Sequence, residues 1–328
     1  MVVLNLAGDV MLGRGVNEAL AEMTPEEVWG DVLPLLLEGG VRIVNLECAI
    51  TDHRKPWTRT PKVFHFRADP RAVEVLSAAR VDAVSLANNH TLDFEEQGLL
   101  DTIAHLRAAG IACAGAGKDL AEASRPAVVE AGGERVALVA FTDNEPPFAA
   151  GPDRPGTNYL PVSLEGEVLE RVEEAVARAR AEGAGIVVFS NHWGPNMVER
   201  PPEHFRRFAR AVVDRGADVY YGHSAHVFQG VEVYRGRPIL YDTGDFVDDY
   251  AVDSHLRNDR SFLFRVEVGE EGLLRRLELF PVRLPYARVR RAVGEEAEAI
   301  MGRMERLSAE MGTRFERAGD RLLLRGPC

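Results

Sequence analysis

Side chains that can bind metals or transfer protons follow a series of apolar segments in this sequence. Each segment is typical of a buried β-strand, but acids, amides or histidines follow it where turn formers such as glycine or serine are usual. The residues at these strand ends are Asp9, Glu47, Asn88, Asn89, His90, His192, His223, His226 and Asp245. Ligands bind at the carboxyl ends of strands in α/β sheets. We therefore expect one cleft to be lined by Asp9, Glu47, Asn89, His90, His192, His223 and His226.

These residue types favour a catalytic divalent metal. Carboxylate oxygens, an amide oxygen and several imidazoles suit Mn²⁺, Fe or Zn²⁺, whereas a structural zinc usually needs cysteines and Ca²⁺ prefers oxygen ligands alone. Such an ion would polarise an ester or acyl oxygen and lower the pKa of a bound water to about 7. Two ions about 3.5–4 Å apart would need a bridging carboxylate, and Glu47 or Asp9 is the natural candidate.

Each of these residues also has an ordinary structural explanation when it is taken alone. A strand-end aspartate such as Asp9 is most often a helix cap or a turn residue, and a lone histidine is more often a satisfied core or surface group. Glu47 could lie at a solvated strand edge. It is the coincidence of so many such endings that favours a shared site.

Other catalytic schemes fit the sequence less well. The stretch GHSAH at 222–226 contains a serine, but no GxSxG motif surrounds it. Cys48 adjoins Glu47, whose charge should raise the pKa of the thiol and make it a poor nucleophile. The glycines of GAGKD at 115–119 complete neither the dinucleotide-binding motif nor the P-loop motif.

Apolar runs and helical patterns alternate along most of the chain, which indicates an α/β fold with mixed sheets. Strands are predicted at 2–7, 41–46, 81–87, 111–114, 136–141, 186–190, 217–221 and 238–241, and helices at 94–109, 168–181 and 201–215. A hairpin is predicted from strands 261–268 and 273–280 around the turn GEEG. A helix at 295–311 and a strand at 321–324 follow it. We therefore expect one domain at 1–285 and a C-terminal appendage at 286–328 packed on it.

Composition excludes some classes of function. The chain has 328 residues, 46% of them hydrophobic, and a net charge of −12. This charge argues against a nucleic-acid partner or a polybasic membrane module, because phosphate-rich partners need an excess of lysine and arginine. The amino end has neither a basic start nor a long apolar stretch, and no apolar run is long enough to span a membrane. From the missing signal peptide and anchor we expect a cytoplasmic protein.

Several motifs together resemble the capsule-synthesis protein family typified by CapA of poly-γ-glutamate capsules. They are AGDVMLGRGV, NLECAIT, SLANNHTLDF with GLLDTIAHL, ACAGAGKDLAEA, NHWG, GADVYYGHSAHVFQGVEVY and YDTGDFV, in the family order from residue 7 to about residue 250. The family has the calcineurin-like metallophosphatase fold. The resemblance therefore implies a metallophosphatase-like layered sandwich of mixed β-sheets flanked by helices.

The resemblance also implies roles for individual residues. Metal ligands would be Asp9, Glu47, Asn89, His192, His223 and His226. His90 would be the acid that protonates the leaving group, and Arg14 would neutralise substrate charge, although Arg14 could equally be a surface residue at a helix start. The chain departs from the general phosphatase pattern in having Met11 in place of the histidine of Asp-x-His and His-x-x-His in place of His-x-His. It also departs from the family it resembles, because Asp245 stands where the GNF motif of that family has an asparagine.

Two functions are compatible with these features. The first is a hydrolase that uses one or two divalent ions on an anionic small molecule, either a phosphoester or a γ-glutamyl linkage of the poly-γ-glutamate type. The second is a non-catalytic accessory protein of capsule synthesis that binds an anionic polymer, which the missing ligand at Met11 favours. The sequence leaves the substrate, the number of ions and the oligomeric state open.

Overall fold

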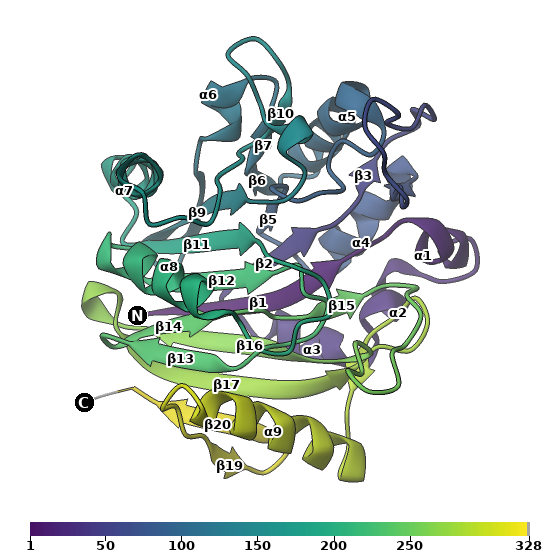
Figure 1. Ribbon diagram of the computed structural model, residues 1–328. Coiled ribbons are helices and arrows are strands. Elements are labelled where there is room, and N and C mark those ends of the chain that lie inside the picture. The colour runs from purple at the N-terminus through teal and green to yellow at the C-terminus, as the bar shows by residue number, and fades with distance from the viewer. Residues whose placement is uncertain (327–328) are drawn as a thin grey trace.

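Two β-sheets pack face to face, and helices cover their outer faces (Figure 1). The computed structural model describes residues 1–326. The first sheet contains β1 (Val2–Val10), β2 (Val41–Leu46), β5 (Ala83–Ser85), β6 (Ala112–Ala114), β15 (Asp245–Val247), β16 (Arg260–Val268), β17 (Leu274–Arg283), β18 (Arg290–Arg291), β19 (Glu316–Ala318) and β20 (Arg321–Arg325). Its strand order is β19-β20-β17-β16-β1-β2-β5-β6, and β15 and β18 pair with β1 and β17.

The second sheet has the strand order β13-β14-β12-β11-β9-β8. Its strands are β8 (Ala127–Ala131), β9 (Glu134–Thr142), β11 (Ile186–His192), β12 (Val219–His223), β13 (Val231–Tyr234) and β14 (Arg237–Leu240). Two short pairs lie outside the main sheets, β3 (Ala49–Ile50) with β4 (Arg67–Ala68) and β7 (Ala116–Gly117) with β10 (Gly156–Thr157). Strands β9, β11, β12 and β14 are parallel, so their carboxyl ends meet at one edge.

Helices form the outer layers of the sandwich. They are α1 (Arg14–Ala19), α2 (Pro25–Trp29), α3 (Leu33–Leu37), α4 (Val73–Ala78), α5 (Glu95–Ala108), α6 (Leu120–Ala123), α7 (Gly166–Ala181), α8 (Glu203–Asp214) and α9 (Gly294–Ala309). Helices α7 and α8 cover the second sheet, since their buried side chains share one apolar cluster with β9, β11 and β12. Helices α2 to α5 share another cluster with β1, β2 and β5. The order of layers is therefore helix, sheet, sheet, helix.

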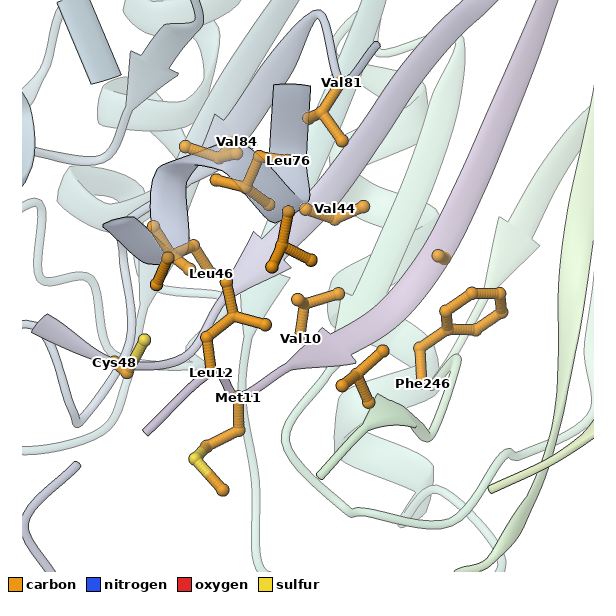
Figure 2. Packing of buried hydrophobic residues seen from close by; sticks show 14 of the residues in the cluster. Val10, Met11, Leu12, Val44, Leu46, Cys48, Leu76, Val81, Val84 and Phe246 are labelled. Carbon is orange, nitrogen blue, oxygen red and sulfur yellow. The ribbon is translucent and has the colours of Figure 1, made fainter. Parts of the chain in front are cut away.

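Burial of both faces explains why the strands read as unbroken apolar runs. In β9, Val136 and Leu138 face the other sheet, whereas Val139 and Phe141 face α7 and α8. Successive side chains of a strand point to opposite faces, so a sheet covered on both sides needs apolar residues at every position. Figure 2 shows part of the outer cluster of the first sheet, where Val44 and Val84 lie beside Leu76 of α4.

The structure confirms the predicted layered sandwich of mixed sheets flanked by helices. Every apolar run predicted as a strand contains one, although the segment 81–87 forms only the short β5, and 217–221 is shifted to Val219–His223. The predicted hairpin is β16 with β17, paired antiparallel. Helices α1 to α4 were not predicted, because each is only five or six residues long and shows no clear periodic pattern.

The C-terminal segment joins the first sheet directly. Strand β20 pairs antiparallel with β17, and buried residues of α9 belong to the apolar cluster between the sheets. Figure 1 shows α9, β19 and β20 together at the β17 edge. The division of the chain at residue 285 stays a prediction. Within residues 1–326, no helix combines the length and apolar character that crossing a membrane requires.

Replacing Gly8 by alanine should destabilise the fold. A Cβ atom at Gly8 would lie 1.8 Å from the carbonyl oxygen of Gly244, so β1 and the turn before β15 would have to separate. We expect the free energy of unfolding to fall by about 1–3 kcal/mol, as for other overpacked sites. Chemical denaturation measures this change. Gly166→Ala is the matched control, because nothing lies within 4 Å of its added Cβ; equal midpoints for the two variants would contradict the prediction.

Candidate metal centre

The carboxyl ends of strands from both sheets meet at one group of buried acids and histidines. Asp9 of β1 is in register with Asp245 of β15. His192 of β11 is in register with His223 of β12. Potential ligand atoms of Asp9, His192 and His223 all lie within 4.8 Å of one another, and we call this group the histidine position. Potential ligand atoms of Asp9, Glu47, His226 and Asp245 also lie within 4.8 Å of one another, and we call that second group the carboxylate position. Asp9 belongs to both positions.

Unusual backbone geometry brings His226 into this group. Ser224 and His226 have φ angles of +116° and +59°, which non-glycine residues rarely adopt. Asp242 holds the loop in place, because its carboxylate accepts hydrogen bonds from the amide nitrogens of Ala225 and Gly244, both at 2.8 Å. Strained backbone of this kind persists where surrounding contacts enforce it, and it is common at functional sites.

The two buried histidines of the histidine position present their Nδ1 atoms to each other and to Asp9. Ser190 Oγ lies 2.8 Å from His223 Nε2, which turns His223 Nδ1 toward the site. His223 Nδ1 lies 2.8 Å from His192 Nδ1 and 3.7 Å from Asp9 Oδ1. Two nitrogens that each bind one zinc ion at about 2.0–2.1 Å are separated by about 3 Å. Burial lowers the pKa of His192 well below its usual value and that of His223 to about 3, so both rings are neutral and can bind a metal.

Several buried oxygen atoms at this site have no hydrogen-bond partner among the described residues. They are both carboxylate oxygens of Glu47, Oδ2 of Asp9, Oδ2 of Asp245 and Oδ1 of Asn89. A buried polar atom without a partner costs free energy, and a buried charge costs far more unless it is paired or binds a metal. The oxygens and the neutral imidazoles therefore make a donor set that fits a divalent cation.

Burial also raises the pKa values of the acids. Burial is the main cause that raises the pKa of Asp9 to about 7, and that of Asp242 to about 7. The pKa of Glu47 is raised well above its usual value by burial and then by the negative charge of Asp9. The pKa of Asp245 is raised well above its usual value by burial and by Asp248. A divalent cation would favour the ionised forms of these carboxylates.

His90 forms a buried pair with Asp93 beside the carboxylate position. His90 Nδ1 lies 2.6 Å from Asp93 Oδ2, and His90 Nε2 lies 3.8 Å from Glu47 Oε1. Phe66 contacts both members of the pair. Its amide donates a hydrogen bond to Asp93 Oδ2 at 2.7 Å, and its ring stacks on the imidazole of His90 with the ring centroids 3.9 Å apart. Burial, the largest effect, lowers the pKa of His90, and the charge of Asp93 opposes this change.

A cleft of about 520 Å³ opens beside these residues. It is lined by Arg14, Pro61, Lys62, Val63, Phe64, Phe66, Asn89, His90, Glu145, Asn196, His226, Tyr250 and Ala251. Lys62 Nζ donates to the carbonyl of Asn89 at 2.7 Å and lies 3.3 Å from Asp93 Oδ1. Arg14 lies at the exposed side of the cleft, paired with Asp249 at 3.0 Å. The volume is in the range of small-molecule sites.

The structure brings most of the residues predicted from sequence to one place. Asp9, Glu47, His192, His223 and His226 share the two metal positions, and Asn89, His90, His226 and Arg14 line the cleft. Arg14 is at a helix start, but its pairing with Asp249 keeps it at the cleft. Met11 is buried and its sulfur accepts a hydrogen bond from the Gly13 amide, so position 11 adds no nitrogen or oxygen ligand. Cys48 has a pKa raised to about 12, as expected, but burial is a larger cause than Glu47.

Sequence reasoning missed three residues of the site, and it left Asp245 out of the ligand set. Asn45 donates to Asp9 Oδ1 at 2.8 Å, and a buried amide inside the apolar strand VRIVNL was a usable signal. Asp93 lies three residues after His90, a spacing that could have suggested the pair. Lys62 reaches the site through contacts between distant segments, so local patterns could not reveal it. Asp245 was recognised as a strand-end residue, but its position beside Asp9 depends on pairing between distant strands.

Comparison with known proteins places these features in a family. The family model for the bacterial capsule synthesis protein PGA_cap matches residues 3–250. A "probable polyglutamine synthesis accessory protein" of Mycobacterium tuberculosis strain H37Rv is 34% identical over 98% of this chain and 95% of its own length. The "PGA biosynthesis protein CapA" of Bacillus subtilis strain 168 is 30% identical over 80% of this chain and 70% of its own length.

Among solved structures, a hypothetical protein from Thermus thermophilus is similar in fold, with a TM-score of 0.50 at 16% identity. The similarity covers 86% of this chain and 100% of that one. It concerns the fold alone. The family model and the two relatives instead concern the sequence, and they agree with the motifs that carried the predicted resemblance. The chain therefore belongs to the bacterial capsule synthesis protein family.

Proposed function

We propose that the protein is a divalent-metal-dependent hydrolase that acts on a phosphoester or a γ-glutamyl amide. The observation that carries the proposal is the set of unpartnered buried oxygens at the two metal positions, beside a cleft that also contains His90. The proposed ligands of one or two Mn, Fe or Zn ions are Asp9, Glu47, Asn89, His192, His223 and His226. A bound divalent ion would polarise the scissile group and lower the pKa of a coordinated water to about 7.

His90 is placed to supply a proton to the leaving group. Asp93 holds Nδ1 of the imidazole, which leaves Nε2 as the atom that exchanges a proton with a substrate in the cleft. Asp93 also stabilises the protonated ring against the effect of burial on the pKa of His90. General acids of this kind typically contribute about 10²–10⁴-fold to a rate.

Arg14 and Lys62 are proposed to bind the anionic part of the substrate. Both line the cleft, and the overall charge of −12 makes local cations necessary to attract an anion. Lys62 is almost fully buried, with 5% of its side chain exposed, and contacts the Asp93 carboxylate that orients His90. The relatives are named for polyglutamine synthesis and for PGA biosynthesis, and we propose a γ-glutamyl chain end as a candidate besides a phosphoester.

A second candidate is a non-catalytic accessory protein that binds an anionic polymer. Two observations favour it: the Mycobacterium tuberculosis relative is called an accessory protein, and Met11 contributes no metal ligand. In that case the acids and histidines of the two positions would bind a metal that stabilises the fold and helps to bind the polymer, without catalysing a reaction.

Removing a histidine of the histidine position separates the two candidates. For a hydrolase, we expect His192→Ala and His223→Ala to lower kcat/KM by about a hundredfold or more, because each removes a metal ligand. For an accessory protein, only metal-dependent stability should change. The assay is a screen of phosphoesters and γ-glutamyl peptides with Mn²⁺, Fe²⁺ or Zn²⁺ added. His204→Ala is the control, since His204 is exposed on α8. Absence of turnover by the wild type with every metal would refute the hydrolase.

The role of His90 predicts a dependence on the leaving group. His90→Ala and Asp93→Asn should slow hydrolysis of alkyl esters by about 10²–10⁴-fold, because a poor leaving group needs a proton. Both variants should retain most activity on p-nitrophenyl esters, whose leaving group departs as an anion. Steady-state kinetics on the two substrate classes measure this difference. An equal loss on both classes would show that His90 is not the acid.

Metal binding should strengthen as pH rises. Burial raises the folded-state pKa of Asp9 to about 7, so in the absence of metal the folded state binds more protons than the unfolded state between about pH 4 and pH 7. The contribution of Asp9 to the stability of the metal-free protein should therefore fall as pH rises through this window. A metal that displaces protons gains affinity about tenfold per pH unit for each proton released. The increase in melting temperature caused by Mn²⁺ should be larger at pH 8 than at pH 5.5, and an equal increase at both would contradict the account.

A further inference from the structure

We propose that Asp245 is an additional metal ligand, which makes the carboxylate position selective for a harder ion than the histidine position. The carboxylate position would take Mn²⁺ or Mg²⁺, and the histidine position would take Zn²⁺ or Fe²⁺. This inference rests on the metal dependence proposed above and deepens it, because it assigns different ions to the two positions. It concerns a residue outside the ligand set predicted from sequence.

Strand pairing fixes Asp245 at the site. The short strand β15 runs parallel to β1, with Asp9 in register with Asp245. Backbone hydrogen bonds from the Asp9 amide to Gly244 and from the Met11 amide to Val247, both 2.9 Å, hold the two strands on either side of the pair. The Asp245 side chain therefore emerges next to Asp9 from a paired strand of the sheet and not from a loop.

The Asp245 carboxylate has one oxygen available for a cation. Asp245 is fully buried, and its Oδ1 lies 2.8 Å from His226 Nδ1. Its Oδ2 has no hydrogen-bond partner among the described residues. The same is true of Oδ2 of Asp9 and of both carboxylate oxygens of Glu47. Ligand atoms of these three acids and His226 lie within 4.8 Å of one another. Three separate strand ends thus each bring a buried carboxylate with at least one unpartnered oxygen into the same group, which a cluster of solvated acids would not do.

The two positions differ in ligand chemistry. The carboxylate position offers Asp9, Glu47 and Asp245 with one imidazole, from His226. The histidine position offers two imidazoles with Asp9 as its carboxylate. Carboxylate oxygens suit Mg²⁺ and Mn²⁺, whereas imidazole suits Zn²⁺ and Fe²⁺. With Asp245 the position offers three carboxylates, whereas an asparagine at position 245 would leave two and remove one negatively charged oxygen donor.

The experiment compares Asp245→Asn with the wild type by calorimetric titration of metal-free protein with Mn²⁺ and, separately, with Zn²⁺. The substitution keeps the side-chain shape and removes one charge and one oxygen. We expect the Mn²⁺ dissociation constant to rise by about a hundredfold, while the first Zn²⁺ equivalent binds within about threefold of the wild type. Glu145→Gln is the matched control, because it removes one charge from the same cleft and no donor of either position. It should leave both affinities within about threefold.

A measurement on the wild type tests the inference even if the Asp245→Asn variant does not fold. Protein given equimolar Mn²⁺ and Zn²⁺ should hold one of each ion by native mass spectrometry. Unchanged Mn²⁺ affinity in a folded Asp245→Asn variant, an equal loss in Glu145→Gln, or two zinc ions in the wild type would overturn the inference. Each of these outcomes leaves the hydrolase proposal intact. Failure of the wild type to bind any divalent ion would overturn both.

Discussion

The site depends on one electrostatic constraint, which is the burial of several carboxylate oxygens that have no hydrogen-bond partner among the described residues, at strand ends of the first sheet. Within residues 1–326, neither oxygen of the fully buried Glu47 has a hydrogen-bond partner, and Asp9 and Asp245 each present one more such oxygen. Histidines complete the group instead of lysine or arginine, so protonation or a bound cation must compensate the charge. A divalent ion meets this requirement with the donors already in place.

The layered fold makes this arrangement possible. Parallel strands deliver their terminal residues to a common edge, so β1 and β2 contribute acids from one sheet while β11 and β12 contribute histidines from the other. Close approach at Gly8 and the loop held by Asp242 bring β15 and His226 to the same point. The long apolar faces of both sheets stabilise strand ends that would be unfavourable without a cation.

Much of this could be predicted from the sequence, because strand ends are local features. An apolar run that ends in a histidine or an acid predicts both the strand and the candidate site residue at its carboxyl end, as for Asp9, His192 and His223. Long-range pairing could not be read in this way. The three-residue strand β15 carries Asp245 to Asp9 across more than two hundred residues, and Lys62 approaches Asp93 from a loop without a periodic pattern. The short helices α1 to α4 lack enough turns for a clear pattern.

The most direct measurement is X-ray diffraction from crystals soaked in Mn²⁺ or Zn²⁺, with data collected at the absorption edge of each metal. The account predicts an anomalous peak within bonding distance, about 2.0–2.3 Å, of an Asp9 oxygen and of nitrogens from His192 and His223. Anomalous maps without a peak at the strand ends, with the carboxylates instead paired to one another through protons, would contradict it.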